Sequence, residues 1–132
     1  MTEKELQQMK REEYNIRMLA SRAIRESYPD VSEIAIRYKA TSMCGEKRVV
    51  EGSRLYKPTD KDVFLIPCPN GTCTGIGFDL SSEVDNAIES KISPYTGTMK
   101  CDGYEDKERF DNYKCDSFVE FEIIVYRSRK SL

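Results

Sequence analysis

Residues 117–127 read Ser-Phe-Val-Glu-Phe-Glu-Ile-Ile-Val-Tyr-Arg, and this stretch decides the fold class. Its apolar side chains recur at every second position: Val119, Phe121, Ile123 and Val125. Side chains two residues apart lie on the same face of a β-strand, so one face is apolar and the other carries Glu120 and Glu122. The pattern predicts a strand with one face in the core and the other in solvent.

Three further segments have the features of strands: residues 32–40, 47–56 and 96–101. In residues 32–40, Ile34, Ile36 and Tyr38 alternate with mostly polar neighbours. A short apolar run at 63–66 leads directly into Pro67 and Cys68. Together these segments predict a mostly antiparallel sheet of four to five strands.

A long helix is predicted for residues 2–28, because its apolar residues follow a three-four spacing. Thr2 and Glu5 form a capping box at its start, and Pro29 ends it. We expect its apolar stripe to pack on the sheet, with self-association through the same stripe as the alternative. A short helix is predicted from a cap at Asp79 or Ser81 to about residue 92.

The expected fold class is therefore α+β, in a single domain over residues 1–132. It comprises an N-terminal helix (1–28), strands (32–66) and a half that carries most of the cysteines (68–127). Hydrophobic residues make up 39% of the chain and charged residues 33%, against about 25% charged in an ordinary domain. A core this thin would benefit from a covalent or metal cross-link.

Several function classes are disfavoured by composition. The chain has no histidine, which excludes Ser-His-Asp and Cys-His catalysis within one chain and makes an enzyme the weaker hypothesis. The net charge of -2 gives no electrostatic case for nucleic acid. No apolar run approaches the roughly 18 residues of a membrane span, and the N-terminus lacks the apolar region of a signal peptide. We therefore expect a cytoplasmic protein without membrane contact.

Four of the five cysteines predict a metal site. Cys68 and Cys73 are separated by four residues, within the spacing of a zinc half-site. Cys101 ends one predicted strand and Cys115 begins another, so antiparallel pairing of these strands would bring their thiols together. A Zn²⁺ ion bound by Cys68, Cys73, Cys101 and Cys115 would have no open position, which is typical of a structural site.

Two alternatives remain for these cysteines. They could be free thiols that pack as small hydrophobic residues, or Cys68 and Cys73 could form a disulfide or redox pair. In a reducing compartment, regularly spaced cysteines are more often metal ligands or catalytic groups than disulfides. Cys44 is expected to be a bystander, although it could replace one of the four ligands.

Residues 62–126 resemble a zinc ribbon, in which two cysteine pairs on β-hairpins hold one metal ion. The resemblance rests on Cys68-Pro69, the glycines after Cys73, and Cys101-Asp102-Gly103. Ribbon pairs usually have two intervening residues rather than the four and thirteen found here, so the chain looks like a divergent ribbon, and the resemblance suggests a bacterial family.

The resemblance implies a binding role, which we expect to be that of a protein-interaction module. A nucleic-acid-binding ribbon and a thiol redox protein are the alternatives. An exposed surface for a partner is expected at Tyr104, Phe110 and Tyr113, and the basic residues Arg127, Arg129 and Lys130 could reach phosphates.

Overall fold

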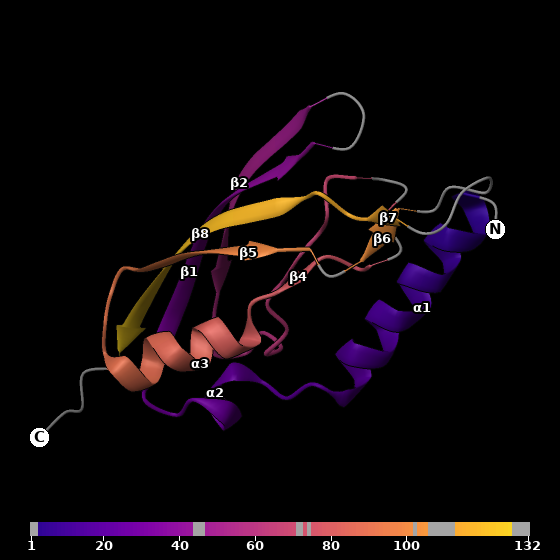
Figure 1. Cartoon of the computed structure of the whole chain (residues 1–132). Helices are drawn as coiled ribbons and strands as arrows, with labels where there is room; N and C mark the ends of the chain where they lie inside the picture. Colours follow the sequence, from indigo (N-terminus) through magenta and orange to yellow (C-terminus); the bar gives the residue numbers. More distant parts are fainter. Residues whose placement is uncertain are drawn as a thin grey trace, which may run out of the picture.

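The computed structural model describes residues 3–43, 47–70, 73, 75–101, 103–105 and 113–127. The fold is α+β, as predicted (Figure 1). The main sheet has four antiparallel strands in the order β2-β1-β8-β5, and β1 and β8 lie at its centre. These strands are β1 (Val31–Ser42), β2 (Arg48–Tyr56), β5 (Tyr95–Lys100) and β8 (Phe118–Arg127).

Two short ribbons lie beside the main sheet and carry the chain past the cysteines. One pairs β3 (Leu65–Ile66) with β4 (Phe78–Asp79), and the other pairs β6 (Tyr104–Glu105) with β7 (Tyr113–Lys114). The β6–β7 ribbon lies in the connection from β5 to β8, whereas the β3–β4 ribbon lies in the connection from β2 to α3 (Figure 1).

The core lies between one face of the sheet, helix α3 (Ser81–Ser90) and the β3–β4 ribbon. The sheet contributes its alternating apolar residues, and α3 contributes Val84 and Ala87. The N-cap residue of α3 is Leu80, so neither Asp79 nor Ser81 is the predicted cap. Asp79 lies one residue before it, and its Oδ1 accepts hydrogen bonds from the Ser81 N–H (3.0 Å) and hydroxyl (2.6 Å). The helix ends at Ser90, before the predicted end, and Ile92 is 54% exposed.

The predicted helix over residues 2–28 is wrong in its length. The structure has α1 (Glu3–Ala20), a break, and then a single helical turn, α2 (Ile24–Ser27). The expected packing of the apolar stripe on the sheet is also wrong for its exposed members, because Ile16 is 66% and Leu19 87% exposed. No helix in the described part of the chain is long and apolar enough to cross a membrane.

Candidate metal centre

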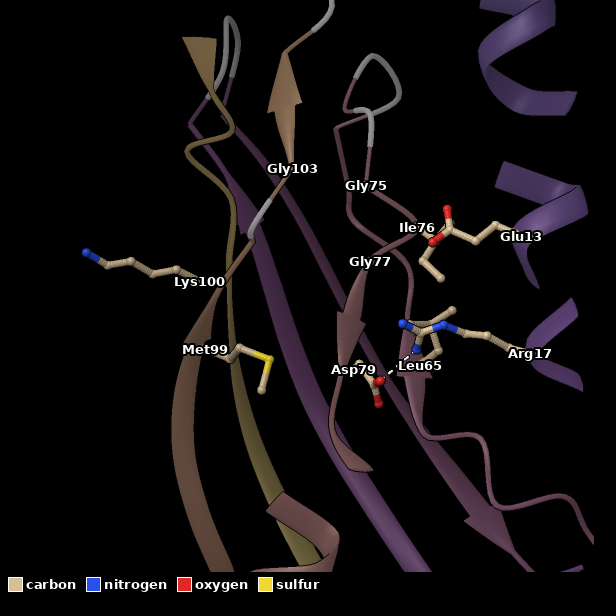
Figure 2. Close-up of a pocket in the computed structure, with 10 residues that line it drawn as sticks. All are labelled: Glu13, Arg17, Leu65, Gly75, Ile76, Gly77, Asp79, Met99, Lys100 and Gly103. Atoms are coloured by element: carbon tan, nitrogen blue, oxygen red, sulfur yellow. Dashed lines mark hydrogen bonds and ion pairs between the residues drawn. The ribbon is translucent and has the colours of Figure 1, made fainter. Parts of the chain in front are cut away.

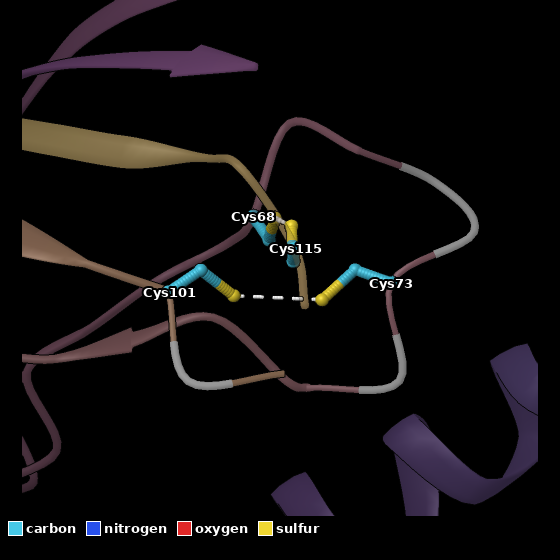
Figure 3. Close-up of side chains that lie close together, drawn as sticks. All are labelled: Cys68, Cys73, Cys101 and Cys115. Carbon is cyan, nitrogen blue, oxygen red and sulfur yellow. Dashed lines mark hydrogen bonds between the residues drawn. The ribbon is translucent and has the colours of Figure 1, made fainter. Parts of the chain in front are cut away.

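Four cysteines from three separate segments converge at one end of the sheet (Figure 3). Cys68 follows β3 and Cys73 lies in the loop from β3 to β4, while Cys101 follows β5 and Cys115 lies between β7 and β8. We call these four residues the cysteine cluster. Their Sγ atoms all lie within 4.8 Å of one another. The structure therefore brings together all four residues that the sequence predicts as ligands.

The closest sulfur pairs lie at the spacing of ligands around one metal ion. Cys73 Sγ is 3.4 Å from Cys101 Sγ, and Cys68 Sγ is 3.7 Å from Cys115 Sγ. Four sulfur atoms placed tetrahedrally at about 2.3 Å from an ion are about 3.8 Å apart. A disulfide needs about 2.05 Å, and all four residues are free thiols. The donor set and its spacing fit a tetrahedral thiolate site.

Strand pairing explains how Cys101 and Cys115 meet. Strands β5 and β8 are antiparallel, with Lys100 opposite Phe118, as expected from the sequence. The pairing continues beyond the strands, because the Cys101 N–H donates to the Ser117 carbonyl (2.9 Å) and the Cys115 N–H to the Gly103 carbonyl (2.9 Å).

Each cysteine of the cluster has a hydrogen-bonding partner two residues further along the chain. The N–H of Gly75 donates to Cys73 Sγ (3.3 Å), and the N–H of Gly103 donates to Cys101 Sγ (3.5 Å). The backbone of Asn70 bonds to Cys68, and the thiol of Cys115 lies 3.2 Å from the Ser117 hydroxyl. Sequence reasoning assigned no role to Asn70 and Ser117.

The two glycine turns pack directly against each other. A Cβ atom at Gly103 would lie 2.5 Å from Cys73 Sγ and 2.6 Å from the backbone nitrogen of Gly75. No side chain fits at such distances, so glycine is required at Gly103 for this approach.

Hydrogen bonds between the thiols give them different pKa values. The pKa of Cys68 is lowered, chiefly because Cys101 and Cys73 donate hydrogen bonds to its sulfur. The same bonds raise the pKa of Cys101, and burial adds to the effect. For Cys73 the bond with Cys101 lowers the pKa, but the bond to Cys68 and burial outweigh it and leave the value raised. Thiols that bind a metal ion lose their protons. The four negative charges would repel one another, so a cation is needed to hold the thiolates together.

The cluster is shielded from solvent. Cys73, Cys101 and Cys115 are at most 5% exposed, and Cys68 is partly exposed. Lys100, which lies next to Cys101, is exposed, and its ammonium points away from Gly75 and Gly103 (Figure 2). This agrees with the alternation of side chains along a strand. The side chain of Lys114 lies outside the described residues, as do Cys44, Phe110, Arg129, Lys130 and the side chains of Tyr104 and Tyr113.

A cavity of about 610 Å³ lies beside the cluster, between α1, β4 and β5 (Figure 2). The turn glycines Gly75 and Gly103 form part of its wall. Arg17 of α1 crosses it to make an ion pair with Asp79, with Nη1 and Oδ2 2.6 Å apart. This pair attaches α1 to the β3–β4 ribbon, and sequence reasoning did not find it.

The basic tail expected to reach phosphates begins with an arginine that already has partners. Arg127 makes an ion pair with Asp30 (2.6 Å) and donates to the carbonyl of Ile88 (2.5 Å). Its guanidinium therefore ties the end of β8 to α3 and to the start of β1.

Comparisons with known proteins leave the site to be interpreted on its own geometry. A scan against protein-family models found no match, and searches of curated proteins and of solved structures found none either.

Proposed function

We propose that this chain is a small zinc-binding protein whose cysteine cluster holds one structural Zn²⁺ ion. The observation that carries the proposal is the convergence of four sulfur atoms within 4.8 Å of one another. Thiolate ligands in a tetrahedral arrangement favour Zn²⁺ or iron. Zinc is preferred here because it needs no redox partner and is the usual ion of closed four-cysteine sites.

A structural role follows from the coordination. All four positions around the ion would be filled by protein, which leaves none for water or substrate. The ion would join the β3–β4 loop to the segments that flank β5 and β8, far apart in sequence. Its binding free energy would then add to the stability of a thin core.

We further propose that the protein acts as a cytoplasmic protein-interaction module. The metal would fix the loops at 68–78 and 102–114 as a recognition surface. A protein partner is favoured over nucleic acid because the net charge is -2 and Arg127 is engaged by Asp30. A thiol redox role is weaker, because every described cysteine lies in one shared cluster and not in an isolated pair.

Native mass spectrometry, combined with thermal melting before and after chelation, tests the metal site. We expect one Zn²⁺ per chain and a melting temperature that falls by at least 10 °C after chelation, since structural zinc contributes roughly 10 kcal/mol or more of binding free energy. Cys73→Ser should lose the ion. Cys44→Ser is the matched control and should retain it.

A metal-free protein that melts at the same temperature with and without chelator would refute the zinc site. A coloured, iron-loaded protein would keep the site and change the ion. If Cys44→Ser lost the metal, the ligand set would have to be revised.

Site-specific photo-cross-linking tests the interaction role. A photoreactive residue at the exposed position Pro67, next to the cluster, should capture one defined protein, and chelation should abolish the capture. The same residue at Lys39, on the outer face of the sheet, is the control and should not capture it. Salt-dependent binding of random-sequence DNA or RNA by the zinc-loaded chain would instead favour the nucleic-acid alternative.

A further inference from the structure

A second cavity, of about 430 Å³, lies away from the cysteine cluster, between α1, the end of β2 and the loop that follows it. We call it the Arg54 pocket. It is lined by Tyr14, Met18, Arg54, Leu55, Tyr56, Asp60, Lys61 and Val63. Its volume falls within the range of about 300–1,000 Å³ that is typical of small-molecule sites.

The lining of the pocket carries a net positive charge, because it contains Arg54 and Lys61 but one acid, Asp60. Arg54 Nη1 donates to the carbonyl of Leu65 (2.8 Å), and its guanidinium also interacts with the hydroxyls of Tyr56 and Tyr38. A guanidinium has five N–H donors, so it can still bind a further acceptor. The ion pairs among described residues are made by Arg17 and Arg127, so neither Arg54 nor Lys61 has a carboxylate partner there. Asp60 accepts the N–H of Lys57 with its Oδ2 (2.7 Å).

A buried hydroxyl lies at the same place. Tyr56 is 9% exposed, and its Oη makes no hydrogen bond of ideal geometry within the described residues. The guanidinium of Arg54 interacts with this hydroxyl, and both groups line the pocket. Arg54 and Tyr56 are two residues apart on β2, opposite Ile36 and Ile34, and therefore lie on the same face of the sheet.

The remaining wall of the pocket is apolar. It consists of Met18, Leu55, Val63 and the ring of Tyr14. A lining that combines guanidinium, ammonium and hydroxyl donors with apolar side chains matches a ligand with an anionic oxygen group on a hydrophobic body.

We propose that the Arg54 pocket is a binding site for a small organic anion, a carboxylate or a phosphate ester with an apolar or aromatic body. Arg54 and Lys61 would bind the anionic oxygens, and the hydroxyl of Tyr56 would donate to one of them. The site is independent of the metal and does not rest on the proposed zinc function.

Calorimetric titration of the zinc-loaded full chain tests this site with benzoate and phenyl phosphate as probes. Benzyl alcohol tests the need for charge, and inorganic phosphate alone tests the need for the apolar body. We expect saturable binding of at least one of the two organic anions, and the tighter of them identifies the oxygen group. Benzyl alcohol and inorganic phosphate should bind much more weakly.

Single substitutions in the pocket test whether the probes bind there. Arg54→Gln should weaken it by about tenfold or more, because it removes a charge-assisted hydrogen bond. Lys61→Gln, at an exposed position, and Tyr56→Phe, which keeps the ring, should each weaken it by a smaller factor. Arg48→Gln removes the same charge from the opposite end of β2 and should leave the affinity unchanged.

Three results would overturn the proposal. They are no saturable binding of either organic anion, equal weakening by Arg54→Gln and Arg48→Gln, and equal affinity for benzyl alcohol. If Arg54→Gln does not fold, Lys61→Gln and Tyr56→Phe decide the question, and unchanged affinity in both would reject the site.

Discussion

Gly103 sets how closely the two glycine turns of the cysteine cluster approach each other. Its missing side chain leaves room for Cys73 Sγ, and its N–H donates to Cys101 Sγ. One residue therefore serves two cysteines that lie in different segments of the chain. Groups of this kind orient the ligands of a metal and tune its affinity without binding it.

If the cysteine cluster holds Zn²⁺ as proposed, we predict that Gly103→Ala weakens its binding by about tenfold or more, because the added methyl group pushes the two turns apart. Competition with a coloured chelator measures the affinity. Gly52→Ala is the control: its Cβ would meet the hydroxyl end of Tyr38 at 2.5 Å, far from the metal, so it should lower stability and leave zinc affinity unchanged. Unchanged zinc affinity in Gly103→Ala would contradict the role assigned to Gly103.

At the residue scale, the sequence was sufficient to choose the four cysteines. The spacing of Cys68 and Cys73 and the strand ends at Cys101 and Cys115 were enough to predict a shared site. The hydrogen-bonding partners of the cysteines were not predictable in the same way. A serine or asparagine two residues after a cysteine is common in turns, and only the folded backbone shows that Ser117 and Asn70 bond to sulfur.

At the scale of elements, the break between α1 and α2 shows why one long helix was the wrong prediction. Residues 21–23 have no helix-breaking glycine or proline. The loop after β2 competes for their backbone instead: Asp62 Oδ1 accepts the N–H of Arg22 (2.9 Å), and the Asp60 carbonyl accepts the N–H of Ile24 (2.8 Å). Tertiary hydrogen bonds of this kind override local helix propensity and leave no periodic signal in the sequence.

We predict that the outer face of α1 contributes little to stability. Leu19→Ser should change the free energy of unfolding by less than about 0.5 kcal/mol, because the side chain is 87% exposed. Ile24→Val, at a fully buried position, should cost about 0.5–1.5 kcal/mol. Urea denaturation compares the two. A loss of more than about 1 kcal/mol in Leu19→Ser would mean that α1 packs through this face after all.

The contribution of the Arg17–Asp79 ion pair to stability should depend on pH. Burial raises the pKa of Asp79, but hydrogen bonds from Ser81 and Arg17 outweigh it and leave the pKa lowered. A carboxyl whose pKa is lower in the folded state stabilises the protein above its unfolded pKa of about 3.9, and this contribution disappears as the pH falls through the folded value. The side chains of Arg17 and Asp79 are 40% and 42% exposed, so the effect of the pair is below about 1 kcal/mol.

We therefore predict that wild type is more stable than Asp79→Asn at neutral pH, and that the difference closes as the pH falls below about 4. Urea denaturation at a series of pH values measures it. A difference that persists in full at lower pH would show that the carboxylate charge is not its source.

At the scale of the whole molecule, the cysteine cluster forms one end of the hydrophobic core. Cys73, Cys101 and Cys115 belong to the same group of buried side chains as the apolar residues of the sheet and of α3, and Cys68 packs against it. The cluster lies beyond the paired ends of β5 and β8. The alternation in residues 32–40 and 117–127 predicted the core strands correctly. The strand order β2-β1-β8-β5 had no such local signal, because it depends on which strands meet after the chain has folded back.

We predict that chelation loosens one half of the molecule before the other. Hydrogen–deuterium exchange should rise first in residues 65–79 and 101–117, which the metal would join, while the β1–β2 pair stays protected. Mass spectrometry of peptides from both regions checks this order. A uniform rise in exchange would show that metal and core form a single cooperative unit.

The central position of β1 and β8 has a consequence for synthesis on the ribosome. Strand β1 leaves the exit tunnel early, but its inner neighbour is the last strand of the sheet to be translated. Until β8 emerges, β1 can pair only with β2, and a two-stranded hairpin is at best marginally stable in water. The sheet therefore closes only after β8 has been made, and the nascent chain must keep its apolar strand faces from aggregating until then.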